Sequence, residues 1–256
     1  MKKKLNRAYY WLFIVIVLSS CANEMDISDD ERNPNQDIEL FVLPDQIKAI
    51  FQFDKSMSEN EKSSVEHILE QLYLNKGTKK LITYIMELGL KIKIKMSPPG
   101  AAVKTDAYCK PYPPVEIGFF SYDRITLENL LHELLHLYAY NQYRTYAQGF
   151  YGACEEYEVR VLTDLLMSTY FNGYNFKYQG IPNDQNLNEK YKNWIMTLRY
   201  SSNYDPDLLK KGFQLYGAVC FINLGGFNDN LRNPNLNPED FNKYSPLLLY
   251  AFWTGF

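Results

Sequence analysis

The sequence predicts an α+β domain in which a small mixed or antiparallel sheet and an apolar helix precede a mostly helical second half. Residues 91–96 alternate between lysine and apolar side chains, and residues 115–120 are largely apolar, so both are expected to be strands. Residues 58–77, 126–138 and 153–167 instead carry apolar side chains at helical spacing. The net charge of −3 gives no indication of a nucleic-acid partner.

The first twenty residues have the three-part layout of a secretory signal. A basic start is followed by an apolar run at residues 11–18, which is too short to span a bilayer. The segment Leu18-Ser-Ser-Cys21 resembles a bacterial lipobox, which implies cleavage before Cys21 and lipid attachment to it. Because Ala22 follows, lipoprotein sorting rules favour the outer membrane of the cell envelope. An ordinary signal peptide or a short membrane anchor is the alternative.

The remaining chain divides into a short tether and one domain. Residues 21–40 are polar and acidic and cannot bury much apolar surface, so we expect a flexible tether. Residues 41–256 are enough for one domain with its own core, which we expect to be monomeric. The three cysteines in this part, Cys109, Cys154 and Cys220, allow one disulfide at most. No C-x-x-C spacing supports a thiolate metal site.

The N-terminal part of the domain is predicted to contain two helices and then a strand. Ser58 and Glu61 have the spacing of a capping box, and Gly77 is expected to end the helix that they open. A second helix is expected at about residues 78–88. His67 lies off the apolar stripe of the first helix and is expected at the surface. The lysine-rich strand at 91–96 is expected at a sheet edge, protected by its charges.

The helix predicted at residues 126–138 carries the most informative motif of the chain. Thr126 is a suitable N-cap, and the segment is apolar nearly all round, which indicates a buried helix. It contains His132, Glu133 and His136 in the pattern H-E-x-x-H. Histidines four residues apart share one face of a helix, so both imidazoles can reach one metal ion. Glu133 can then take a proton from a water on that metal.

A core helix with neutral, hydrogen-bonded histidines is the structural alternative. It accounts easily for one buried histidine. It accounts poorly for three ionisable side chains in one apolar helix, because each is costly to bury without a partner.

A site of this kind needs a third protein ligand, and an acidic cluster offers three candidates on the predicted helix at 153–167. Helical angles place Glu155 and Glu158 closer to its apolar stripe than Glu156. The chain here resembles the zincin metallopeptidases whose third ligand is a glutamate on the following helix. The nineteen residues between His136 and Glu156 match the thermolysin-like spacing, and the eighteen before Glu155 match an aminopeptidase-like spacing.

The resemblance implies a zinc ion held by His132, His136 and Glu156, with Glu133 as general base. The local pattern Glu156-Tyr-Glu-Val is also similar to the E-x-E-A helix of ImmA/IrrE-type peptidases, whose first glutamate is the ligand. Glu155 and Glu158 remain open as alternatives. Asp164 and, if it is not a ligand, Glu158 are candidates to hydrogen-bond a ligating histidine.

The resemblance also implies a zincin-like fold, covers roughly residues 90–170, and departs from thermolysin in one respect. No histidine follows His136, so a tyrosine or an arginine would have to stabilise the oxyanion. In zincins an edge strand lines the substrate cleft. Beyond the resemblance, helical patches near residues 190–199, 207–223 and 241–252 indicate a helical second lobe that forms the far wall of that cleft.

Two classes of function follow from these residues. In the first, the protein is a lipid-anchored zinc metallopeptidase that cleaves a peptide or protein substrate. In the second, it is a non-catalytic surface-binding lipoprotein that retains a zincin scaffold. A purely structural metal site is a weaker third possibility, which would lack the open position for water.

Overall fold

Four short strands form one mixed sheet with the order β1-β2-β4-β3. The computed structural model describes residues 43–97, 106–143, 150–171, 174 and 185–200. Strands β1 (Phe51–Phe53), β2 (Ile92–Met96) and β4 (Val115–Phe119) are parallel. Strand β3 (Ala107–Lys110) runs antiparallel to β4 and forms one edge.

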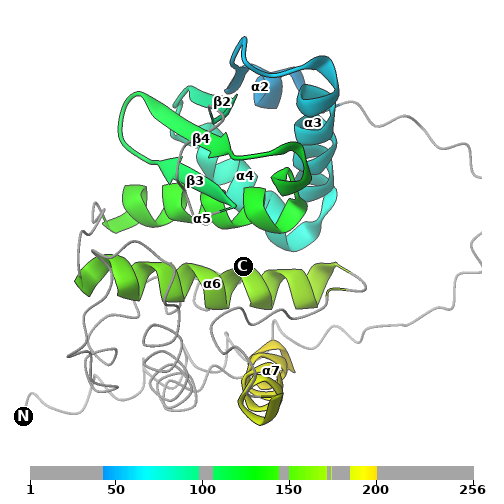
Figure 1. The fold of residues 1–256 in the computed structure, drawn as a ribbon, viewed down its shortest axis with the longest axis vertical. Coiled ribbons are helices and arrows are strands. Elements are labelled where there is room, and N and C mark those ends of the chain that lie inside the picture. The colour runs from blue at the N-terminus through cyan, green and yellow to red at the C-terminus, as the bar shows by residue number, and fades with distance from the viewer. Residues whose placement is uncertain (1–42, 98–105, 144–149, 172–173, 175–184, 201–256) are drawn as a thin grey trace, which may run out of the picture. The chain divides into compact units, whose positions relative to one another are not determined.

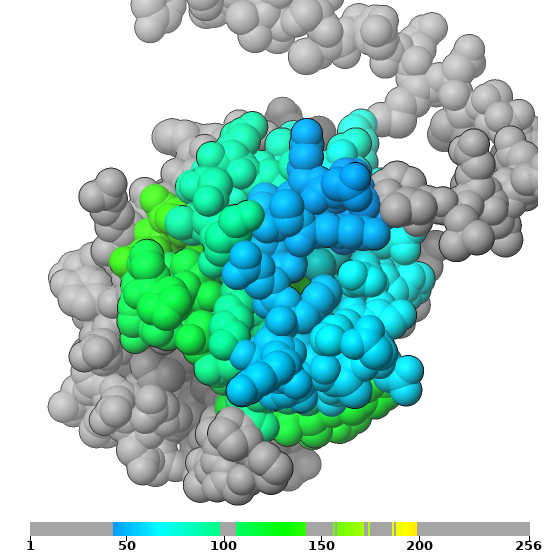
Figure 2. Space-filling model, turned by 90° about the horizontal axis from the view of Figure 1, so that it is seen from above, coloured from blue at the N-terminus to red at the C-terminus, as the bar shows by residue number. Residues whose placement is uncertain are grey.

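The helices lie mainly in layers on one side of this sheet. Within the described residues they are α2 (Asp45–Lys48), α3 (Glu59–Leu74), α4 (Lys76–Glu87), α5 (Leu127–Tyr143), α6 (Phe150–Tyr170) and α7 (Gln185–Tyr200). Helix α5 lies beneath the sheet, α6 packs against α5, and α7 packs against α6 (Figure 1). Seen from above, the described surface comes mainly from α2, α3 and the strands, coloured blue to green (Figure 2). The predicted α+β architecture with a small mixed sheet is confirmed.

The strands predicted at residues 91–96 and 115–120 are present as β2 and β4. Ile92 and Ile94 are fully buried, as the alternation predicts. The prediction that the lysine-rich strand lies at an edge is wrong, because β2 lies between β1 and β4. Lys93 pairs with Asp54 and Lys95 pairs with Glu116, so these lysines occupy one face of the sheet rather than its edge.

Helix α3 begins with the predicted capping box. The Ser58 hydroxyl accepts a hydrogen bond from the Glu61 backbone N–H at 3.4 Å, and the Ser58 N–H donates to the Glu61 carboxylate at 2.6 Å. Two backbone donors at the helix N-terminus are thereby satisfied. The side chain of His67 is 66% exposed, which confirms its predicted surface position.

The predicted role of Gly77 is wrong. Helix α3 already ends at Leu74, and Asn75 separates it from α4, so Gly77 lies in the first turn of α4. A Cβ atom on Gly77 would lie 1.9 Å from the Tyr170 ring. The Asn75 side-chain amide also donates to the Tyr170 carbonyl at 3.0 Å. A side chain at this position would therefore have to displace the Tyr170 ring, where α4 approaches the end of α6.

Helix α5 is buried at the centre of the described structure, between the sheet and α6. Its apolar side chains are almost fully buried, namely Leu130, Leu131, Leu134, Leu135, Leu137, Tyr138 and Ala139. This surrounding packing makes α5 a rigid support for the polar side chains that it carries. Within the described residues, no helix combines the length and the apolar character needed to cross a membrane.

Several predictions concern residues outside the described ranges. These are the signal at 1–20, the tether at 21–40, Cys220, and the helical patches at 207–223 and 241–252. The patch at 190–199 falls within α7. Cys109 is buried in β3.

Candidate metal centre

Helix α5 brings His132 and His136 together on the side that faces α6. The helix is preceded by Thr126, whose hydroxyl accepts a hydrogen bond from the Asn129 N–H at 3.2 Å, as expected of an N-cap. The two histidines are one turn apart, and their Nε2 atoms lie 3.2 Å from each other. Their rings are nearly perpendicular, with centroids 4.8 Å apart. Both imidazoles thus present a nitrogen to one point in space.

Helix α6 supplies a carboxylate to the same point. Glu156 Oε1 lies 3.0 Å from His132 Nε2, and Glu156 Oε2 lies 3.0 Å from His136 Nε2. The side chains of His132, His136 and Glu156 are 8%, 13% and 16% exposed, so all three are shielded yet still reached by solvent. The structure therefore brings together the three residues that the sequence predicted as ligands.

The spacing of these atoms suits a zinc ion. With Zn–N and Zn–O bonds of about 2.0–2.1 Å, ligand atoms at the corners of a tetrahedron lie about 3.3 Å apart. The two imidazole Nε2 atoms are 3.2 Å apart, and each lies 3.0 Å from a different oxygen of the Glu156 carboxylate. One ligand atom from each of the three residues lies within 4.8 Å of the others. Two imidazole nitrogens and one carboxylate also form a donor set that zinc commonly takes. Among the described residues, this trio is the group of histidine, cysteine and acidic side chains close enough to hold a metal ion.

The pKa values of His132 and Glu156 are both lowered. Burial lowers the pKa of His132 to about 4, against the attraction of Glu156. Burial pushes the pKa of Glu156 upward, but the two histidines outweigh this effect and hold it well below its ordinary value. Both shifts favour the forms that bind a metal ion, which are a neutral imidazole at His132 and an ionised carboxylate at Glu156.

Glu133 follows the first histidine on α5 and is 6% exposed. Burial raises the pKa of Glu133 to about 7, and the charges of His136 and Glu156 act on it in opposite directions. A carboxyl group with a pKa near neutrality is suited to accept and return protons. Glu133 is therefore a buried carboxyl group that can take up and release a proton near neutral pH.

The other acidic candidates of α6 lie elsewhere. Glu158 is buried but is not part of the cluster, and the side chain of Glu155 is outside the described residues. Asp164 accepts hydrogen bonds from the hydroxyls of Tyr174 and Tyr191, each at 2.6 Å. It thus ties α6 to α7 and to Tyr174. These bonds connect Asp164 to tyrosines rather than to a ligating histidine.

Two contacts between α5 and α6 were not expected from the sequence. Thr163 Oγ1 lies 3.4 Å from His132 Nδ1, and Arg160 Nη1 lies 2.9 Å from Glu128 Oε1. Both contacts depend on the antiparallel packing of α5 against α6. No pattern within either helix alone identifies such partners.

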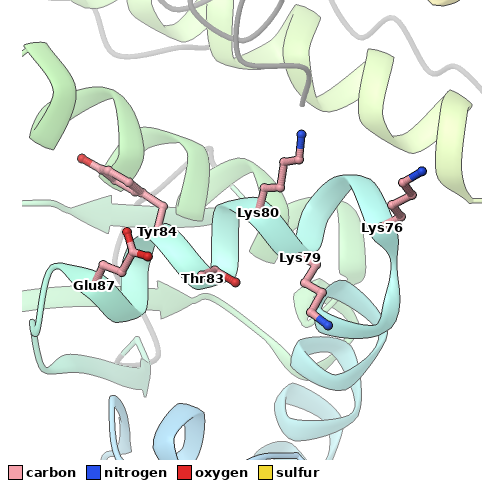
Figure 3. Close-up of a pocket in the computed structure, with 6 residues that line it drawn as sticks. All are labelled: Lys76, Lys79, Lys80, Thr83, Tyr84 and Glu87. Atoms are coloured by element: carbon pink, nitrogen blue, oxygen red, sulfur yellow. The ribbon is translucent and has the colours of Figure 1, made fainter. Parts of the chain in front are cut away.

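A surface pocket also lies along α4, and Figure 3 shows the residues that line it. They are Lys76, Lys79, Lys80, Thr83, Tyr84 and Glu87, and all come from that one helix. None of them belongs to the cluster on α5 and α6. The largely apolar lining comes from long side chains spread along an exposed helix face.

Comparison with known proteins gives no family assignment. No family model, no curated protein and no solved structure matches this chain. The α+β fold and the His132–His136–Glu156 cluster are features of the structure itself.

Proposed function

We propose that this protein is a zinc-dependent metallopeptidase of the zincin type. The observation that carries the proposal is the cluster of His132, His136 and Glu156, in which one possible ligand atom from each residue lies within 4.8 Å of the others. A carboxylate completes the set from the helix that follows the H-E-x-x-H helix, and Glu133 lies beside the first histidine. A purely structural zinc site would have no use for this additional buried acid.

The arrangement of the described elements supports a zincin-like fold. Helices α2, α3 and α4 and the four strands precede the motif helix α5 in the described chain. Strand β3 is the antiparallel edge strand, and it lies beside α5 (Figure 1). An edge strand in this position is suited to line a cleft that holds an extended peptide. We therefore propose that the substrate is a peptide or protein and that part of it lies along β3.

In this proposal, the metal ligands and Glu133 have separate roles in hydrolysis. Bound zinc supplies Lewis acidity, which makes water more acidic and polarises a peptide carbonyl. His132, His136 and Glu156 hold the ion and leave a position open for water or substrate. Glu133 takes the proton from the attacking water and returns it to the leaving amine.

Zinc content and peptide cleavage measured together test this proposal. The purified protein is expected to contain about one zinc per chain and to cleave members of a broad peptide library. A strong chelator should stop cleavage, and added zinc should restore it. Protein that binds zinc through these residues but cleaves no peptide or protein would contradict the proposal and favour the non-catalytic scaffold.

We also propose that the enzyme is anchored to the bacterial cell envelope, on the outer membrane, by lipid on Cys21. The support is the basic and apolar leader before Leu18-Ser-Ser-Cys21. Replacing Cys21 with alanine is expected to move the protein from the membrane fraction to a soluble or mislocalised form. An intact mass of the mature protein that shows an unmodified N-terminus would contradict the anchor. It would leave a secreted enzyme in its place.

A further inference from the structure

We propose that Thr163 is a positioning residue that fixes the ring orientation and the tautomer of His132. This inference rests on the proposed metal site. Thr163 is fully buried in the middle of α6, and its hydroxyl oxygen lies 3.4 Å from His132 Nδ1. It contacts the ring on the opposite side from the Nε2 atom that faces Glu156.

The direction of this hydrogen bond follows from the other partner of Thr163. The Thr163 hydroxyl donates its single hydrogen to the Val159 carbonyl at 2.8 Å. A hydroxyl has one hydrogen and two lone pairs, so toward His132 it can only accept. The hydrogen shared with His132 must therefore sit on Nδ1. In a neutral imidazole this leaves a lone pair on Nε2.

That lone pair points at a second electron-rich group. Glu156 Oε1 lies 3.0 Å from His132 Nε2. A bare imidazole nitrogen and a carboxylate oxygen repel each other at this distance unless a cation or a proton lies between them. The contact with Thr163 thus prepares Nε2 to be a metal ligand.

Thr163 is suited to this task by its place in the helix. A threonine side chain has restricted rotation about its first torsion, and the bond to the carbonyl four residues earlier fixes it further. Thr163 is fully buried, so bulk water cannot compete with His132 for its hydroxyl group. Asp164, the next residue, is held by two tyrosine hydroxyls and forms a separate network.

Two variants separate the hydroxyl from the packing of the side chain. Thr163→Val keeps the shape and removes the hydroxyl, whereas Thr163→Ser keeps the hydroxyl and removes the methyl group. Zinc affinity of the full chain is measured by competition with a chelating indicator. Thr163→Val is expected to weaken zinc binding about 10- to 100-fold, as loss of a partner to a ligating histidine typically does. Thr163→Ser should stay within about threefold of the parent, because it keeps that partner.

The outcomes separate this inference from the proposal on which it rests. If the parent binds no zinc, the proposed function fails. If the parent binds zinc and Thr163→Val binds equally well, the role of Thr163 is wrong. A Thr163→Ser variant that binds as weakly as Thr163→Val would show a packing role only and would also overturn it.

Nitrogen NMR of the histidine rings gives a readout that packing alone would not change. In the zinc-loaded parent, His132 is expected to carry its proton on Nδ1, with slow exchange against solvent. Thr163→Ser should keep this slow exchange, and Thr163→Val should speed it. Ligation of zinc through Nδ1 of His132 in the parent would overturn the inference, even if Thr163→Val fails to fold.

Discussion

Replacing Glu133 with glutamine is expected to abolish peptide hydrolysis while zinc remains bound. The amide cannot accept the proton of the attacking water, and the three ligand side chains are unchanged. Loss of a general base typically lowers the rate by about 10²- to 10⁴-fold. Because Glu133 is 6% exposed and close in size to glutamine, the variant should fold and bind zinc as the parent does.

The measurements for this variant are kcat on a cleaved peptide and zinc content. Glu189→Gln is a matched control, since it makes the same chemical change on the exposed surface of α7. It should cleave at the parent rate. A Glu133→Gln variant that also cleaves at the parent rate would show that Glu133 is not the base.

The parts of the fold that were predictable from the sequence are those determined by local pattern. The capping box at Ser58 and the alternation at residues 91–96 involve neighbours in sequence, and both are seen. Strands β1 and β3 were not predicted. They contain three and four residues, which is too short for a periodic signal. The place of β2 within the sheet depended on β1, so it could not be predicted either.

The same distinction applies to the candidate site. His132, Glu133 and His136 are joined by spacing within one helix, and spacing was enough to find them. The side-chain partners Thr163 and Arg160 depend on how α6 lies against α5. Gly77 is another case, because the ring that leaves no space for a side chain there belongs to Tyr170, ninety-three positions later in the chain. Contacts of this kind form only when two helices pack together, so the sequence of one helix alone does not predict them.

The choice among the three glutamates shows why local geometry alone was misleading. Helical angles put Glu155 and Glu158 nearer the apolar stripe of α6, which suggested that they face inward. The structure places the Glu156 carboxylate between the two imidazoles and leaves Glu158 out of the cluster. The side chains of the cluster lie between α5 and α6 and are 8–16% exposed, so a residue beside the apolar stripe rather than on it can reach them.

Replacing Glu156 with glutamine is accordingly expected to weaken zinc binding by more than roughly 100-fold. Loss of a residue that only hydrogen-bonds a ligand costs up to about 100-fold, and loss of a ligand should cost more. The neutral amide binds zinc poorly, and the negative charge that offsets the metal is removed. Zinc affinity by chelator competition, together with metal content after dialysis, measures the effect.

Glu155→Gln and Glu158→Gln are the matched controls, because they make the same change at the two competing positions of the same helix. Both should keep zinc affinity close to that of the parent.

If Glu155→Gln or Glu158→Gln lost the metal while Glu156→Gln kept it, the third ligand would be misassigned, although His132 and His136 could still bind the ion. If all three variants kept the metal, the carboxylate that meets both imidazoles at 3.0 Å would be a hydrogen-bonding partner of neutral or protonated histidines rather than a ligand. Helix α5 would then be a core helix with hydrogen-bonded histidines, and the burial of Glu133 in this apolar helix would need another explanation.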